Sequence, residues 1–273
     1  MRNYQTLVRR VLDHGERKGG PQAEETLAIF GAQLRFSIQR GFPLITSRSL
    51  KGSWRALVHE LLWFLSGSTH IRDLHAHDVH LWDMWATPRI SGQMGYEPGE
   101  LGPIYGKLWR SFGPNGVDQI ERLIHGLKTN PYSRRHIVTA WNPEEADAVF
   151  VAPCHCFFQF LVLGDKLSLH LYQRSADVPV GVPFNIAEYS LLLMMVAQVT
   201  GYEVGDFIHS FGDTHIFLNQ IPYMDELLRR DPRLLPRVQI NPDVRDIFGF
   251  RFEDFELIGY DPHPAIKGIP VAL

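Results

Sequence analysis

Residues 152–160 read Ala152-Pro153-Cys154-His155-Cys156-Phe157-Phe158-Gln159-Phe160, a thiol directly after a proline and directly before an apolar run. Apolar residues keep alternating up to Val162 and again from Leu167 to Leu171, on either side of a Gly-Asp turn. Two period-two runs around such a turn predict a β-hairpin. Because proline fixes its own φ and lacks an N–H, Pro153 predicts that Cys154 lies at a rigid start of the first strand.

The second strand of this hairpin ends in Tyr172-Gln173-Arg174-Ser175-Ala176-Asp177, which the turn brings back to the neighbourhood of Cys154. An arginine near a thiol lowers the pKa of the thiol and increases the thiolate fraction. Cys154 is therefore a candidate nucleophile supported by Arg174. The alternative is that Cys154 is a small buried hydrophobic residue.

The composition indicates a globular protein of the reducing cytoplasm. A chain of 273 residues can bury a sizeable core, and a net charge of −3 provides no basic surface for DNA or for a membrane. Cys154 and Cys156 are too close in sequence to join two elements by a disulfide. We expect neither a signal peptide nor a membrane span, because no apolar stretch fits either.

Hydrophobic periodicity predicts a mixed α/β fold. Apolar residues recur at helical spacing over residues 4–14, 54–65, 117–127 and 186–199. Strands are expected over residues 26–38, with a break at Gly31, and over 137–141 and 237–240. Residues 16–25 are polar and turn-rich and predict a mobile loop, whereas the Pro-rich tail is expected to fold back over a site.

Three features between residues 54 and 106 are candidates for function. Glu60 lies in an apolar helix, where a carboxylate is costly unless it is paired or has a chemical role; a satisfied or edge-exposed glutamate is the alternative. Trp82 and Trp85 lie three residues apart and either pack in the core or form a stacking surface for a flat ligand. Tyr105 belongs to a Gly-rich segment that is expected to be a site loop.

Polar residues elsewhere leave alternatives open. His70, His75, His77 and His80 crowd one segment, but their spacing fixes no zinc geometry, so we expect no metal. The adjacent pair at residues 134–135, Arg-Arg, either holds a phosphate or is solvated. Asn185 is an N-cap, or its amide binds a donor and an acceptor of a ligand together.

Seven motifs in one order resemble the folate-dependent thymidylate synthase family, within the thymidylate synthase and pyrimidine nucleotide hydroxymethylase superfamily, over nearly the whole chain. The ordered set is far more specific than any one motif. The motifs are His59-Glu60-Leu61-Leu62-Trp63-Phe64-Leu65, Ser133-Arg134-Arg135, Ala152-Pro153-Cys154-His155, Gln173-Arg174-Ser175, Pro183-Phe184-Asn185, Gly212-Asp213-Thr214-His215 and Tyr260-Asp261-Pro262-His263-Pro264.

The resemblance implies that the Cys154 thiolate attacks C6 of a pyrimidine and makes C5 nucleophilic toward the one-carbon unit of 5,10-methylenetetrahydrofolate. Glu60 would organise proton transfer through water, and Tyr105 would assist removal of the C5 proton. Arg174 would support the thiolate and bind phosphate. The amide of Asn185 would bind the uracil edge, and the imidazole of His215 would bind the ribose. The residues implied to bind the nucleotide besides Arg174 are Arg134, Arg135, His155, Gln173, Ser175, Asn185 and His215.

The resemblance also implies a folate site and a second subunit. Asp177 would hydrogen-bond the folate ring, and the terminal carboxylate of Leu273 would help to close a lid that excludes water. Arg134 and Arg135 would reach the phosphate in the partner's site, which implies an obligate homodimer. The residues implied to bind folate are Trp82, Trp85, Asp177, Gly181, Phe184 and Leu273.

The fold that the resemblance implies is one catalytic domain over residues 1–273, with a large mixed β-sheet covered by helices and sheet-to-sheet contact between two subunits. Three departures touch nucleotide binding. Pro21-Gln22-Ala23 stands where the family has Arg-Thr-Gly, whose arginine binds phosphate, and Arg17 or Lys18 is a possible substitute. Phe217 stands in place of a tyrosine that helps to hold the ribose, and Phe211 in place of a glycine.

We therefore predict conversion of dUMP to dTMP with 5,10-methylenetetrahydrofolate. One alternative is a pyrimidine nucleotide hydroxymethylase, in which water rather than hydride captures the exocyclic methylene, acting on dUMP, UMP or a cytosine nucleotide. Asn185 argues against cytosine, because relatives acting on cytosine tend to carry aspartate there. The other alternative is an inactive homologue that binds nucleotides or RNA, and the intact set of Cys154, Arg174 and Glu60 argues against it.

Overall fold

The structure, a computed structural model, describes residues 1–20 and 24–271. It confirms a mixed α/β fold built on a six-stranded sheet whose spatial order is β1-β2-β6-β5-β4-β3. Strands β5 and β6 run parallel, and the other neighbouring strands run antiparallel. The strands are β1 (Glu16–Lys18), β2 (Thr26–Ser37), β3 (Ile137–Thr139), β4 (His155–Leu163), β5 (Lys166–Asp177) and β6 (Glu203–Phe217).

The predicted hairpin is confirmed as β4 and β5. Gly164 has a φ of +63°, a conformation that glycine adopts without the steric cost of a side chain. Leu163 pairs with Lys166 at the turn, and His155 pairs with Gln173 at the far end, where the register shifts between His155 and Phe157. The hairpin thus returns the end of β5 to the residues just before β4.

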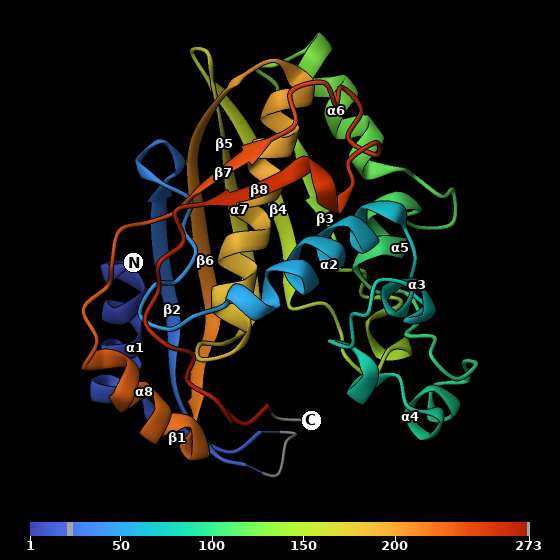
Figure 1. The fold of residues 1–273 in the computed structure, drawn as a ribbon. Helices are drawn as coiled ribbons and strands as arrows, with labels where there is room; N and C mark the ends of the chain where they lie inside the picture. Colours follow the sequence, from blue (N-terminus) through green and yellow to red (C-terminus); the bar gives the residue numbers. More distant parts are fainter. Residues whose placement is uncertain (21–23, 272–273) are drawn as a thin grey trace.

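Two long helices cover one face of this sheet. Helix α7 (Gly181–Thr200) packs against β5 and β6, and α2 (Trp54–Ser66) crosses in front of α7 (Figure 1). Helix α7 is long and apolar enough to cross a membrane, but 83% of that apolar window is buried inside the fold, as expected of a core helix. Helix α2 ends at Gly67, whose φ is +83°.

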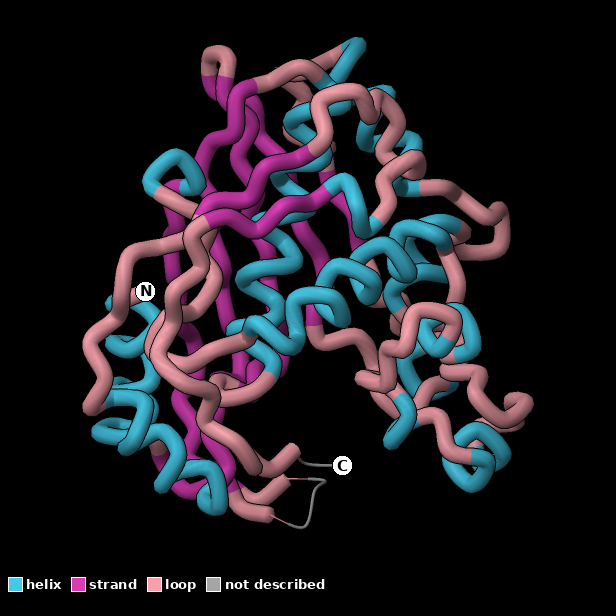
Figure 2. Tube along the Cα trace, in the orientation of Figure 1, coloured by secondary structure: helices cyan, strands magenta, loops and turns pink. Residues whose placement is uncertain are grey.

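The remaining elements surround this core. Helix α1 (Arg2–His14) is followed by Gly15 and packs against β2 and against α8 (Ile221–Leu228). Helices α5 (Tyr105–Arg110) and α6 (Gln119–Thr129) lie near β3, and long loops connect the short helices α3 (Arg72–His75) and α4 (Pro88–Gln93) (Figure 2). Strands β7 (Arg237–Ile240) and β8 (Phe255–Ile258) form a separate antiparallel pair.

Several predicted boundaries were wrong. Part of the loop expected over residues 16–25 is strand β1, paired with β2, while residues 21–23 lie outside the described structure. Residues 26–37 form one strand rather than two, because the pairing with β6 keeps the same register on both sides of Gly31. The strand predicted to reach residue 141 ends at Thr139, and α7 begins at Gly181, five residues before the predicted start.

The second face of the sheet is exposed. Along β4 the buried residues Phe158, Phe160 and Val162 alternate with Phe157 and Leu161, which are 42% and 39% exposed. Neighbouring strands carry polar side chains on this face, where Ser210 accepts a hydrogen bond from Gln33 and pairs with His170. An apolar strip of this kind within a polar surface is typical of a protein interface.

The parallel pairing of β5 with β6 predicts a strict requirement for glycine at residue 205. The register shifts between Leu167 and Leu169, and a Cβ added to Gly205 would lie 2.4 Å from Ser168 Oγ and 2.8 Å from the Leu167 carbonyl oxygen. We expect Gly205→Ala to lower the free energy of unfolding by about 1–3 kcal/mol through overpacking, measured by denaturant titration. Gly52→Ala, whose Cβ would meet nothing within 4 Å, is the matched control. If both variants unfold at the same denaturant concentration, the close approach of β5 to Gly205 is contradicted.

Candidate active site

Cys154 is held by backbone contacts on both sides. Its N–H donates to Tyr105 Oη at 2.8 Å, and its carbonyl oxygen accepts the backbone N–H of Arg174 at 2.8 Å. The Arg174 guanidinium donates from Nε to the Pro153 carbonyl oxygen at 3.0 Å and from Nη2 to that of Ala152 at 2.7 Å. The predicted rigid start of the strand is therefore confirmed, and Arg174 itself supplies much of the rigidity.

The Cys154 thiol has a raised pKa, which corrects the sequence-based expectation. Burial raises the pKa most, while the charge of Arg174 and a hydrogen bond from Tyr105 lower it by less. The effect of the arginine thus has the predicted sign but does not prevail. In the free protein the thiol is therefore mainly protonated near pH 7.

Tyr105 is the first residue of α5 and is 3% exposed, so the expected site loop is a buried helix start. Burial raises the pKa of the Tyr105 hydroxyl well above its ordinary value, so it accepts the Cys154 N–H as a neutral phenol. The ring packs against that of Phe64, with centroids 4.7 Å apart. Tyr105 therefore connects α2, α5 and the cysteine.

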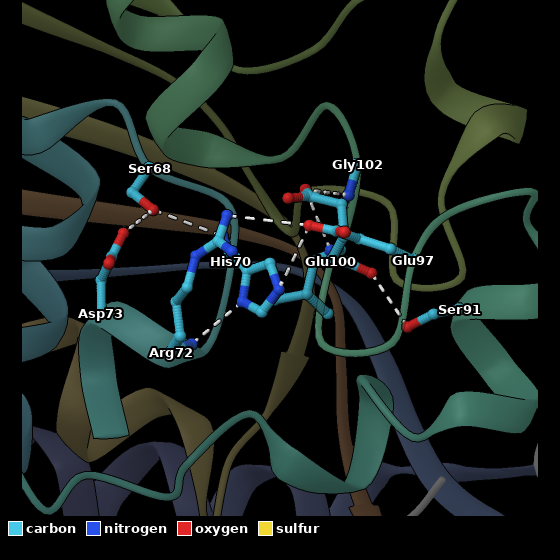
Figure 3. A network of polar contacts seen from close by, with 9 residues as sticks. Ser68, His70, Arg72, Asp73, Ser91, Glu97, Glu100 and Gly102 are labelled. Carbon is cyan, nitrogen blue, oxygen red and sulfur yellow. Dashed lines mark hydrogen bonds and ion pairs between the residues drawn. The ribbon is translucent and has the colours of Figure 1, made fainter. Parts of the chain in front are cut away.

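A polar network holds the segment that precedes Tyr105 (Figure 3). The Glu100 carboxylate accepts the backbone N–H of Leu101 and of Gly102, and Ser91 Oγ donates to the Glu100 carbonyl oxygen at 3.0 Å. Gly99 has a φ of +91°, and a Cβ there would lie 2.6 Å from the His70 ring. The network fixes the start of α5 and so the position of the tyrosine hydroxyl.

Glu60 lies in α2, is 9% exposed, and accepts a hydrogen bond at 2.6 Å from Trp82 Nε1. The carboxylate therefore has a partner, which the apolar surroundings alone could not reveal. Trp82 is 7% exposed and contacts Trp85 edge-to-face, with centroids 5.5 Å apart. Trp82 is buried and offers no surface to a flat ligand, whereas the partly exposed Trp85 does.

Asn185 lies inside α7 rather than at its N-cap, which corrects that alternative. It is 8% exposed, and its Nδ2 donates to Glu188 Oε2 at 3.4 Å. Burial lowers the pKa of the neighbouring His155 to about 4. The imidazole is therefore neutral near pH 7 and lies beside the Asn185 amide, which donates to Glu188.

The pairing of β5 with β6 brings together three more of the candidate residues. Ser175 pairs with Asp213, and Asp177 pairs with His215. Burial raises the pKa of Asp177, and hydrogen bonds from the Val180 N–H and from Gln220 oppose the shift. Gln173, in contrast, is 3% exposed, and its side chain donates to the Ser175 carbonyl oxygen and pairs with a buried histidine.

Other predicted site residues lie elsewhere or cannot be placed. Arg134 and Arg135 are exposed just before the edge strand β3. Arg135 lines a groove of about 580 Å³ between α6 and β3 that Cys154 does not line. Gly181 and Phe184, at the start of α7, are partly exposed. Leu273 lies outside the described residues.

The departures at the nucleotide end also have defined surroundings. Lys18 forms an ion pair with Asp213, so its charge is already engaged, and Arg17 lies 3.8 Å from Glu25. Phe217 is 4% exposed and packs edge-to-face against His215 at 5.2 Å, while Phe211 is 2% exposed. The Pro21-Gln22-Ala23 segment lies outside the described residues.

The crowded histidines separate into distinct environments. His70 joins the network of Figure 3, and His77 stacks on His59 at 4.1 Å. His75 and His80 both hydrogen-bond the Asp83 carboxylate, at 2.6 and 2.8 Å. Ligand atoms of these three residues lie within 4.8 Å of one another at the surface, and all three are already paired among themselves.

The family model described as thymidylate synthase matches residues 2–272 of this chain.

The chain belongs to the thymidylate synthase family.

This assignment makes the protein an enzyme of one-carbon transfer in nucleotide biosynthesis, and its mixed sheet flanked by helices is the thymidylate synthase fold. The sequence-based prediction missed Glu188, His209 and Gln220, which are buried polar residues in contact with Asn185, Gln173 and Asp177 respectively. The sequence could have indicated Glu188, because a charged residue three positions after Asn185 in an apolar helix lies on the same helix face. No sequence signal distinguished His209 or Gln220 from residues of an ordinary strand and turn.

The raised pKa of Cys154 predicts its alkylation behaviour. We expect the rate with iodoacetamide to keep rising as the pH passes the ordinary cysteine pKa of about 8.5, because the thiolate forms later than usual. Arg174→Gln removes the positive charge that lowers the Cys154 pKa, so the pKa should rise further. At a pH below the pKa, the alkylation rate should then fall about tenfold for each unit by which the pKa rises. Cys154→Ser provides the background from Cys156. A rate that levels off below the ordinary pKa would show a depressed value instead.

Proposed function

We propose that this enzyme converts dUMP to dTMP with 5,10-methylenetetrahydrofolate as co-substrate, and that residues 1–273 form one catalytic domain. The observation that carries the proposal is the fixed backbone of Cys154. Cys154 lies between Tyr105 and Arg174 in a chain that matches the thymidylate synthase family from residue 2 to residue 272. Both contacts hold the backbone next to the thiol in one position, which supports the proposed role of Cys154 as nucleophile.

In the proposed reaction Cys154 Sγ attacks C6 of the pyrimidine as a thiolate. Its raised pKa means that binding has to favour ionisation, and Arg174 is the cation whose charge does so. The Arg174 guanidinium is fixed by the Ala152 and Pro153 carbonyl oxygens, so its charge needs no reorganisation when the thiolate forms. We propose that Arg174 also contacts the substrate phosphate together with Ser175, and that Gln173 supports this site from within.

Proton transfers are assigned to two buried groups. Glu60, held by the Trp82 indole, would organise proton transfer through water near the reacting carbons. The neutral Tyr105 phenol would assist removal of the C5 proton. Asn185 would bind N3–H and O4 of uracil, with the neutral His155 beside it, and His215 would bind the ribose.

The proposed folate site lies at the start of α7 and the end of β5. Asp177 accepts the N–H of Val180 and a hydrogen bond from Gln220, so its carboxylate is positioned and still partly exposed. The partly exposed Trp85 and Phe184 rings suit a flat heterocycle, with Gly181 and Leu273 proposed nearby and Trp82 acting mainly through Glu60. When bound, the folate supplies the one-carbon unit and the reducing equivalents.

We further propose a cytoplasmic homodimer formed through the exposed face of the sheet. The strip containing Phe157, Leu161 and Tyr172 gives that face apolar residues beside hydrogen-bonding ones. Such a composition suits an interface between two copies of one surface. Arg134 and Arg135, exposed next to the edge strand, would then reach the partner's phosphate site. No DNA or membrane partner is proposed.

A nucleotide panel tests the reaction. We expect dihydrofolate formation with dUMP and methylenetetrahydrofolate, and a decrease in kcat of at least about a thousandfold in Cys154→Ser. Cys156→Ser is the matched control, because Cys156 is a buried neighbour.

UMP, dCMP and CMP complete the panel. Tetrahydrofolate together with a hydroxymethylated product would identify the hydroxymethylase alternative. An absence of turnover with every nucleotide would support the inactive binding protein.

Subunit complementation tests the shared site. We expect Cys154→Ser and the double variant Arg134→Ala/Arg135→Ala each to be nearly inactive. After subunit exchange, a hybrid dimer carries one intact site if the arginines act across the interface, so activity returns to about one quarter of native. If the arginines act within their own subunit, every hybrid site lacks one essential group, and mixing restores nothing.

A further inference from the structure

Glu188 is a buried carboxyl group beside two of the proposed catalytic residues. It lies in α7 three residues after Asn185, so the two side chains are neighbours on one helix face. Glu188 is 2% exposed. Helix α2, which carries Glu60, crosses in front of α7 (Figure 1). Glu188 has no role in the proposed catalytic mechanism.

Its contacts connect the two residues. Glu188 Oε2 accepts a hydrogen bond from Asn185 Nδ2 at 3.4 Å, and the Glu188 carboxyl is also in hydrogen-bond contact with that of Glu60. Glu60 in turn accepts the Trp82 N–H. Within residues 1–20 and 24–271, Glu188 Oε1 is buried and has no donor. Two ionised carboxylates can only accept hydrogen bonds, so their contact requires a proton on one of them.

The charges around Glu188 assign that proton. Burial raises the pKa of Glu188 well above its ordinary value, the charge of Glu60 raises it further, and only the hydrogen bond from Asn185 opposes this. From α2 the facing titratable group is Glu60. Tyr189 on α7 itself and Tyr105 of α5 stay neutral, because burial raises both hydroxyl pKa values. Among the described residues no cation contributes to the shift, so a proton has to neutralise the pair.

We propose that Glu188 is a protonated positioning residue that donates to Glu60, accepts from Asn185, and thereby makes the site selective for the lactam edge of uracil. The proposal rests on the proposed function. With Nδ2 directed to Glu188, the Asn185 amide keeps Oδ1 free to accept from N3–H, and its second N–H can donate to O4. Cytosine presents the reverse pattern, an acceptor at N3 and a donor at C4, and would require the amide to rotate.

Infrared spectroscopy tests the proton without requiring turnover. We expect the native protein at neutral pH to show the band of a buried protonated carboxyl group, and Glu188→Gln, which is isosteric, to lack it. The Glu188→Gln side chain can still donate to Glu60 and accept from Asn185, so the fold is expected to remain intact. If the native and Glu188→Gln proteins give the same carboxyl band, Glu188 is ionised and the proposal is wrong.

Kinetics with uracil and cytosine nucleotides test the positioning role. Glu188→Ala removes the acceptor for Asn185, so we expect kcat/KM for the uracil nucleotide to fall by about 10- to 100-fold and the uracil-to-cytosine ratio to fall with it. Glu188→Gln is expected to keep the ratio. Native kcat should decline at alkaline pH as Glu188 loses its proton, and Glu188→Gln should lose that decline.

The outcomes separate this proposal from the proposed function. If the native enzyme methylates dUMP but both variants keep the native pH profile and base ratio, Glu188 only fills space and the proposal is overturned. If the native enzyme uses no pyrimidine nucleotide, the proposed function fails, and so does the claim of uracil selectivity. The infrared result then still decides whether Glu188 holds the proton.

Discussion

The hydrogen bonds from the Arg174 guanidinium to the carbonyl oxygens of Ala152 and Pro153 are the constraint on which the active site depends. They connect the segment before β4 to a side chain of β5, the central strand beside it. Because β5 also pairs in parallel with β6, the same strand fixes Asp213 and His215 relative to the thiol. One rigid strand therefore positions the proposed nucleophile, its cation and the proposed ribose end of the site, so that the proposed reaction would need little reorganisation on binding.

Burial in this region shapes the chemistry as much as position does. Cys154, Tyr105 and Glu188 all have raised pKa values because the charged form of each is poorly solvated, and His155 has a lowered one for the same reason. The site is thus neutral in its resting state apart from Arg174 and the carboxyl groups that the fold pairs or exposes. A bound anionic nucleotide would add its own charge to a preformed arrangement of dipoles, and this would concentrate electrostatic effects on the reacting atoms.

Two of the departures from the family pattern, Phe211 and Phe217, lie in one strand, β6. Phe211 and Phe217 are both buried there. Lys18, a cation that could replace the missing arginine, already forms an ion pair with Asp213. The contacts of Cys154, Tyr105 and Glu60 do not involve these residues. The residues that depart from the family pattern therefore lie apart from the hydrogen bonds that hold Cys154 and Glu60.

The sequence by itself determined the hairpin around Cys154, the helices of the core and the set of chemical groups, because period-two and helical patterns, glycine turns and ordered motifs are local. It could not place Asn185 inside α7, show that Tyr105 is buried, or pair Glu60 with Trp82. It also gave the pKa of Cys154 the wrong net direction, since an arginine nearby is visible in a sequence but burial is not. Only the tertiary structure decided these points: desolvation and long-range hydrogen bonds depend on which elements pack together.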